Sequence, residues 1–286
     1  MTFVEIIASH NSWDAEREKL NEVIELLNAN GLSVKAGSRL YRYQRILKAL
    51  EDENIEDLPK GFTLKKFHQI ASEIHQLHTG VVELSNSKNF AEWSDKLSFI
   101  ISGKELPESD SDYTARNYQF ELYIAGLIKK SGLEPLHREP DIQINQDGKN
   151  FGIAIKRSNS FNKLDEILKK GRKQIVKTGV PGIIFVDVTR ISNPENYIAY
   201  ANSVNDVTKD LIRFLDLFYE KNYSSMRNII SHNLVFGIAL YASCLCNING
   251  ALGHSSRITI KSLCSETSPY IIDLSYFANS LRNVLQ

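Results

Sequence analysis

The chain has 286 residues, of which 42% are hydrophobic and 24% charged, as in ordinary soluble globular proteins. Basic and acidic residues number 34 each, so net charge favours no polyanionic partner, and a nucleic-acid surface would need local clustering. The polar N-terminal segment does not fit a signal peptide, and no apolar run is long enough to span a membrane. We therefore expect a cytoplasmic protein without a membrane partner.

The first hundred residues carry amphipathic helical patterns and no catalytic motif. Three histidines in this region, His68, His75 and His78, are interpreted as residues of a polar helix face rather than as metal ligands. The acidic segment 103–112 contains Gly and Pro and is the best linker candidate. We expect a helical N-terminal domain over residues 1–105 and a second domain over residues 106–286. Apolar residues recur at helical spacing in residues 13–30, 40–50, 64–84 and 90–101.

Helices and strands alternate in the second part of the chain, which predicts a mixed α/β domain with a central sheet. Expected helices are 114–130, 164–177 and 206–219; expected strands are a hairpin over 141–157 and the segments 182–188, 234–245 and 257–263. Three cysteines near the C-terminus, Cys244, Cys246 and Cys264, are expected to be reduced and buried, because their spacing is a poor match to zinc sites.

The hairpin around the turn at 146–149 carries the most informative residues. Asp141 lies on the polar face of its first strand, while Ala154 and Lys156 share a face of the second. If the two polar faces coincide, Asp141 and Lys156 lie side by side. Ala154 then stands where a second acidic residue would complete a divalent-metal site.

Pro140-Asp141 followed by Ala154-Ile155-Lys156 resembles the signature of the PD-(D/E)xK nuclease superfamily, which has the restriction-endonuclease-like fold. The resemblance covers about residues 113–190. It implies a core built from a helix, a three-stranded meander, a second helix and a further strand. It also implies that a helix acid, matched by Glu121, and the motif Asp141 hold Mg²⁺, with Mn²⁺ as a possible substitute.

The residue types suit this chemistry, although each has a simpler structural explanation. Asp141 offers the hard oxygen atoms that Mg²⁺ prefers, but an Asp after Pro is also common in turns. Lys156 can stabilise negative charge at a scissile phosphate, or it can be an ordinary lysine at a strand end. Glu121 lies on an apolar helix face, so its carboxylate needs a partner, a metal or access to water. Gln174 resembles a helix residue that contacts phosphate or positions water in many members.

Ala154 departs from the family pattern, because its side chain cannot coordinate a metal. Three explanations are open at this stage. In the first, the residue was changed deliberately to inactivate a nuclease. In the second, a ligand at another position replaces it, and Gln143, Asp147 and Glu139 are the candidates. In the third, the protein lost cleavage and kept binding. Cleavage by the unchanged chain, with no gain from Ala154→Glu, would exclude the first explanation.

Basic residues cluster from 156 to 177, where eight of them accompany two acids. Such clustering in a neutral chain is typical of phosphate contact, although a solvated helix face explains part of it. We expect nucleic-acid contacts from Arg157, Lys170, Arg172 and Lys173.

These observations predict a metal-dependent DNA endonuclease, in restriction, antiviral defence or repair, with cleavage impaired by Ala154. RNA stays open as a substrate. A homodimer is expected, because cutting two strands needs two sites. Without a GxxxxGK[ST] loop, nucleotide hydrolysis would come from a helicase or ATPase partner. The rival interpretations are a non-catalytic nucleic-acid-binding or assembly subunit with a degenerate nuclease fold, and a protein-interaction module.

Overall fold

The computed structural model describes residues 13–104, 113–146, 148–195, 197–249, 251–263, 270–282 and 284. The chain divides into two compact units, one of residues 1–127 with 250–252 and one of residues 128–249 with 253–286. We expected a boundary near residue 105, whereas this division falls inside helix α6 (Thr114–Lys130). Most of the linker candidate, from residue 105 to residue 112, lies outside the described residues.

The first unit is helical, as the sequence predicted. Apolar residues spaced three and four apart, such as Leu20, Val23 and Leu27 in the first helix, are fully buried and give each helix one packed face. Ser38 and Thr63 cap the second and third helices, each accepting from a backbone N–H three residues on. The helices of the first unit are α2 (Trp13–Ala29), α3 (Arg39–Glu51), α4 (Leu64–Ser85), α5 (Ser94–Ile100) and the first part of α6, with 3-10 turns at Ile55–Asp57 and Phe90–Trp93.

Helices α4 and α6 pack backbone against backbone through two glycines. A Cβ atom on Gly126 would lie 2.5 Å from the carbonyl oxygen of Thr79, and one on Gly80 would lie 3.0 Å from the backbone of Leu122. No side chain larger than hydrogen fits at Gly126 without moving a helix.

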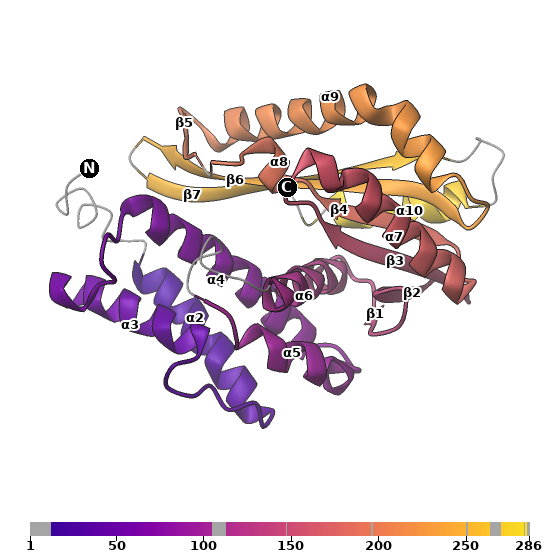
Figure 1. The fold of residues 1–286 in the computed structure, drawn as a ribbon. Coiled ribbons are helices and arrows are strands. Elements are labelled where there is room, and N and C mark those ends of the chain that lie inside the picture. The colour runs from indigo at the N-terminus through magenta and orange to yellow at the C-terminus, as the bar shows by residue number, and fades with distance from the viewer. Residues whose placement is uncertain are drawn as a thin grey trace. The chain divides into compact units, whose positions relative to one another are not determined.

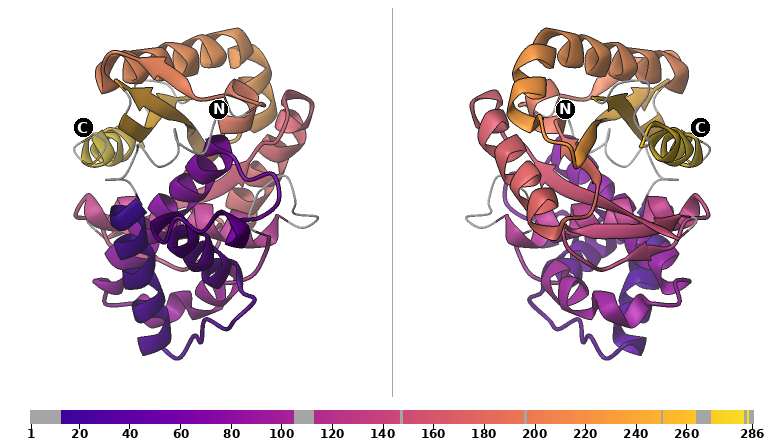
Figure 2. Two further views of the ribbon diagram at one scale, coloured as in Figure 1. Left: turned by 90° about the vertical axis from the view of Figure 1, so that its left-hand side faces the viewer. Right: turned by 90° about the vertical axis from the view of Figure 1, so that its right-hand side faces the viewer.

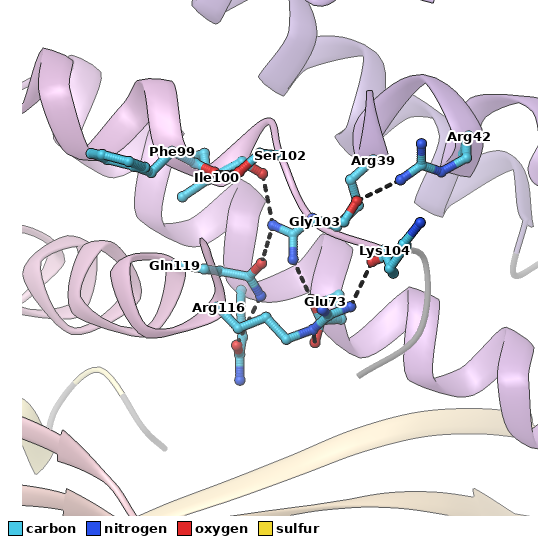
Figure 3. Close-up of polar contacts among 11 residues, drawn as sticks. Arg39, Arg42, Glu73, Phe99, Ile100, Ser102, Gly103, Lys104, Arg116 and Gln119 are labelled. Carbon is cyan, nitrogen blue, oxygen red and sulfur yellow. Dashed lines mark hydrogen bonds and ion pairs between the residues drawn. The ribbon is translucent and has the colours of Figure 1, made fainter. Parts of the chain in front are cut away.

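A buried polar cluster joins the helices of the first unit, and Figure 3 shows its side chains pointing toward one another. Glu73 of α4 lies between two arginines, at 3.0 Å from Arg39 and 3.1 Å from Arg116. Arg39 also donates to Gln119 at 2.7 Å, and both arginines are almost fully buried. Burial disfavours the charged form of Arg116, but the neighbouring charge of Glu73 raises its pKa above the ordinary value. One carboxylate thus holds two buried cations from different helices.

The second unit is built on a mixed sheet of seven strands in the order β1-β2-β3-β4-β6-β5, with β7 also paired to β6 (Figure 1). Strands β1, β2 and β3 form an antiparallel meander, and the pairs β3–β4, β4–β6 and β6–β5 are parallel. This confirms the predicted α/β class. The strands are β1 (Pro135–Leu136), β2 (Ile142–Gln146), β3 (Lys149–Arg157), β4 (Gly182–Asp187), β5 (Ala199–Ala201), β6 (Val235–Ile248) and β7 (Ala251–Ser262).

Helices cover both faces of this sheet. Helices α7 (Leu164–Thr178) and α9 (Val204–Ile230) bury apolar residues against one face, where Leu168 and Leu215 join Ile184 and Ile238 in one hydrophobic cluster. On the other face α10 (Ile271–Arg282) packs Phe277 against Phe151 of β3, with ring centroids 5.1 Å apart. Figure 2 shows α9 and α10 on different sides of strands β6 and β7.

Several elements differ from the sequence-based expectation. Helix α9 extends to Ile230 rather than ending near residue 219, and α10 and the short α8 (Thr189–Ser192) were not expected. Strands β1 and β5 have two and three residues, too few for a period-two pattern to be read. No helix in the described part of the chain is both long and apolar enough to cross a membrane.

The cysteines were only partly predicted. Cys246 is buried and free, as expected, but Cys244 is half-buried, and Cys264 lies outside the described residues. The histidines also differ, because His68 is only 2% exposed and belongs to the core rather than to a polar face. His78 does lie at the surface and contacts Glu22 at 2.8 Å.

Candidate functional site

The β2–β3 hairpin has the register that the sequence predicted. Gln143 pairs with Gly152 and Gln146 with Lys149, so continuing the ladder sets Asp141 opposite Ala154. The start of β2 is held close to β3, since a Cβ atom on Gly152 would lie 3.0 Å from the ring of Pro140. The hairpin therefore brings Pro140-Asp141 directly onto the strand that carries Lys156.

Asp141 and Lys156 form an ion pair, as the shared face predicted. The Lys156 ammonium lies 2.9 Å from Asp141 Oδ2 and 2.6 Å from the carbonyl oxygen of Ile155. The same Asp141 oxygen accepts the backbone N–H of Ile155 at 2.7 Å. The two side chains are 13% and 17% exposed, so this ion pair is largely screened from water.

Helix α7 contributes the third member of the site, Gln174. Its Nε2 donates to Asp141 Oδ1 at 3.2 Å and to the carbonyl oxygen of Pro140 at 3.0 Å. The helix can approach this closely because Gly171, three residues earlier on the same side, has no side chain: a Cβ atom there would lie 2.8 Å from Ile184 of β4. The structure thus brings together three of the predicted site residues, Asp141, Lys156 and Gln174.

The oxygen atoms around Asp141 fit a hard divalent cation. The Asp141 carboxylate, the Ile155 carbonyl and the Gln174 side-chain carbonyl are all oxygen donors, the type that Mg²⁺ prefers. Gln174 Oε1 is buried without a hydrogen-bond partner in the described part of the chain, so it is an acceptor available to a ligand. No group of three or more His, Cys, Asp and Glu side chains gathers as a metal site among the described residues.

Ala154 belongs to the core rather than to a polar groove. It has no exposed surface and lies in the hydrophobic cluster with Leu164, Leu168 and Ile184. The expectation of a polar face on β3 is therefore wrong at this position, since α7 covers it. Among the candidates for a relocated ligand, Gln143 is 8% exposed and donates its amide to the Glu139 carbonyl, while Asp147 lies outside the described residues.

Glu121 is buried in the first unit, where its carboxylate lies 2.5 Å from the Lys96 ammonium. The Lys96 ammonium also lies 5.6 Å from the centre of the Trp93 ring and 5.8 Å from that of Tyr118. Glu121 therefore has the partner that its apolar helix face demands, and the alternative of a carboxylate in water is wrong. Its role as a metal ligand beside Asp141 stays a prediction.

The basic residues fall into two groups. Arg157 points to the face of β3 opposite Lys156 and forms an ion pair with the buried Asp187 at 3.0 Å. On α7, Lys170 and Lys173 are exposed and Arg172 is half-buried. Lys170 pairs with Glu166 at 2.6 Å, and its hydrogen bond and charge lower the pKa of that carboxyl group. Their contacts with nucleic acid stay predictions.

Two charged partners were missed by sequence reasoning, Lys96 and Asp187. Each is far along the chain from the residue it pairs with, and neither stands in a recognisable motif. The only available signal was indirect: Glu121 on an apolar helix face requires a buried cation or a metal.

Comparisons of the chain with protein-family models, with curated proteins and with solved structures gave no match.

Proposed function

We propose that the chain from α6 onward is a nuclease-type domain of the PD-(D/E)xK superfamily that binds DNA and hydrolyses phosphodiester bonds with the help of a divalent cation. The observation that carries the proposal is the convergence of Asp141, Lys156 and Gln174, which come from a strand start, a strand end and a helix. All three polar groups lie within 3.2 Å of a partner in this set. A carboxylate, an ammonium and an amide around one point are suited to a phosphate and its counter-ion.

The order of elements supports the same assignment. Helix α6, the antiparallel meander β1–β2–β3, helix α7 and the parallel strand β4 follow one another along the chain. This is the order that the resemblance implies for the superfamily core. Because folds host many functions, the order supports the fold assignment, while the side chains at Asp141 carry the functional one.

Asp141 and Gln174 would hold the cation, and Glu121 is the further acid that the resemblance offers. A divalent cation at this place would polarise the phosphate and activate water. The Lys156 ammonium would contact a non-bridging oxygen of the scissile phosphate and stabilise the charge that develops there. The exposed lysines of α7 would bind neighbouring phosphates along the strand.

A second candidate, a DNA-binding subunit that does not cleave, is favoured by Ala154. Ala154 ends in a methyl group within an apolar cluster and has no side-chain atom that can coordinate a metal, so reduced or absent cleavage is the expected consequence. Both candidates share the DNA-binding surface and differ only in hydrolysis. A homodimer, a helicase or ATPase partner and a cytoplasmic role in restriction, antiviral defence or repair are parts of the same proposal.

Cleavage of supercoiled plasmid and of a labelled duplex by the full chain, with Mg²⁺ or Mn²⁺ and with a chelator, tests the proposal. Hydrolysis should require the cation and fall roughly 100-fold or more in Asp141→Asn. Asp165→Asn, at an exposed acid of α7, is the matched control. Parallel reactions with single-stranded DNA and RNA identify the substrate. Binding without hydrolysis by the unchanged chain and by Ala154→Glu would select the non-cleaving candidate.

A further inference from the structure

We infer that Gln174 is a metal ligand of this domain and supplies, from α7, the side-chain oxygen that Ala154 of β3 cannot supply. The inference rests on the proposed function and deepens it, because it names the residue that completes the cation site. It differs from the role implied by resemblance, in which this helix position contacts phosphate or positions water.

The orientation of Gln174 is determined by its own hydrogen bonds. Its Nε2 has two acceptors, the Pro140 carbonyl at 3.0 Å and Asp141 Oδ1 at 3.2 Å. Rotating the amide by half a turn would set Oε1 against these two oxygen atoms, which is unfavourable. The nitrogen therefore faces Asp141, and Oε1 is left as the atom without a hydrogen bond.

A buried carbonyl oxygen without a partner is costly unless a ligand satisfies it. Leaving an acceptor unsatisfied away from water is destabilising, and native structures contain few such atoms. Gln174 Oε1 is one of them in the described part of the chain, and it lies on the residue that touches the motif Asp141. A cation bound to Asp141 would satisfy it, as would a water molecule bound to that cation.

The place beside Asp141 already attracts a positive charge. The Lys156 ammonium lies between Asp141 Oδ2 and the Ile155 carbonyl, at 2.9 and 2.6 Å. Together with Gln174 Oε1, these oxygen atoms would offer a cation one carboxylate and two carbonyls. Mg²⁺ commonly binds to proteins through one or two carboxylates while keeping several water molecules, so this set is sufficient.

Calorimetric titration of the full chain with Mn²⁺ alone, without nucleic acid, tests the inference. Gln174→Met should lower the affinity on the order of 10-fold or more, whereas Gln174→Glu should keep or raise it. Comparing the two variants separates a metal ligand from a residue that only positions Asp141. Gln174→Glu retains the ligand oxygen but loses the N–H donor that holds Asp141. If Gln174 only positions Asp141, both substitutions should weaken binding equally.

Gln146→Met is the matched control, because Gln146 also has a buried Oε1 without a described partner but lies at the far end of the hairpin. The affinity of Gln146→Met for Mn²⁺ should equal that of the unchanged chain. Melting curves should show that every variant folds. Unchanged affinity in Gln174→Met, or equal losses in both Gln174 variants, would overturn the inference while leaving the proposed nuclease activity standing. Absence of Mn²⁺ binding by the unchanged chain would overturn the inference, and cleavage assays then judge the proposed function separately.

Discussion

Lys156 and Asp141, fifteen positions apart in the chain, form an ion pair across 2.9 Å in which the ammonium lies where a cation bound to the carboxylate would lie. The pair is largely buried, so its interaction is weakly screened by salt. Lys156 therefore has two opposing effects in the proposed site. It competes with a divalent cation for Asp141, and it supplies positive charge to a bound phosphate.

Lys156→Met should separate these two effects. Removing the ammonium removes a competitor, so affinity for Mn²⁺ should rise on the order of 10-fold, which corresponds to about 1.4 kcal/mol. Hydrolysis should fall by roughly 100-fold, because the charge beside the phosphate is lost. Titration calorimetry and cleavage rates measure the two quantities, with Lys149→Met on the same strand as control. Weaker Mn²⁺ binding in Lys156→Met would contradict the competition.

Ala154→Glu should destabilise the protein when no cation is present. The substitution sets a carboxylate in a cluster without exposed surface, where the cost is about 2–4 kcal/mol even with Lys156 nearby. Divalent cations should recover part of this loss, because the new carboxylate can coordinate them. Thermal melts with and without Mg²⁺ measure both effects, and Ala154→Leu is the control for size alone. A variant as stable as the unchanged chain without cation would show that the position is less apolar than described.

The exposed lysines of α7 should determine the salt dependence of DNA binding. Each phosphate contact contributes a slope of about 0.9 in the logarithmic plot of affinity against salt, so replacing Lys169, Lys173 and Lys177 by Ala should lower the slope by about 2–3. The control replaces three exposed basic residues of α9, Lys209, Arg213 and Lys221. Fluorescence anisotropy at several salt concentrations gives the slopes. Equal slopes for both triple variants would remove α7 from the DNA-binding surface.

Glu73→Gln should strongly destabilise the helical first unit. Glu73 is the shared partner of Arg39 and Arg116, so Glu73→Gln removes the carboxylate charge that both buried cations contact. The expected loss is about 3–5 kcal/mol, as for other broken buried ion pairs. Chemical denaturation followed by circular dichroism measures it, and the exposed Glu25→Gln is the control. A change below about 1 kcal/mol would mean that other groups neutralise the arginines.

Stability should fall between pH 6.5 and pH 4 because of His68. Burial lowers the pKa of this histidine to about 4 in the folded protein, against an ordinary value of 6.5. As pH falls through this window the unfolded chain binds a proton that the folded chain does not, so folding is disfavoured by up to roughly 3 kcal/mol. His68→Gln should reduce the difference in unfolding free energy between pH 7.5 and pH 4.5 relative to the unchanged chain. An equal pH dependence in the variant and the unchanged chain would contradict this assignment.

The central hairpin could be predicted because strand alternation is a local property. The period-two pattern set Asp141 and Lys156 on one face, and their ion pair follows directly from it. Helix α6 could be predicted to its end residues, since its apolar spacing and the following Gly132 are both visible in the chain. Neither prediction required knowledge of distant contacts.

The environment of Ala154 and the partner of Glu121 could not be predicted, because both depend on tertiary packing. Helix α7 covers the face of β3 that carries Ala154 because the helix approaches the sheet closely at Gly171. The spacing of apolar residues in the sequence does not predict this approach. The contact of Glu121 with Lys96 joins two helices through residues twenty-five positions apart, without any motif. The orphaned Oε1 of Gln174 likewise follows from where its amide nitrogen is bound.

The most direct test of the account is a crystal structure of the protein grown with Mn²⁺, in which anomalous scattering locates the cation. We predict an anomalous peak within about 2.5 Å of a carboxylate oxygen of Asp141, with the Lys156 ammonium moved away from that oxygen. Crystals of Asp141→Asn grown with Mn²⁺ in the same way should lack the peak. An Mn²⁺ soak that leaves the Asp141–Lys156 ion pair intact, with anomalous peaks only elsewhere, would contradict a divalent-cation site at Asp141.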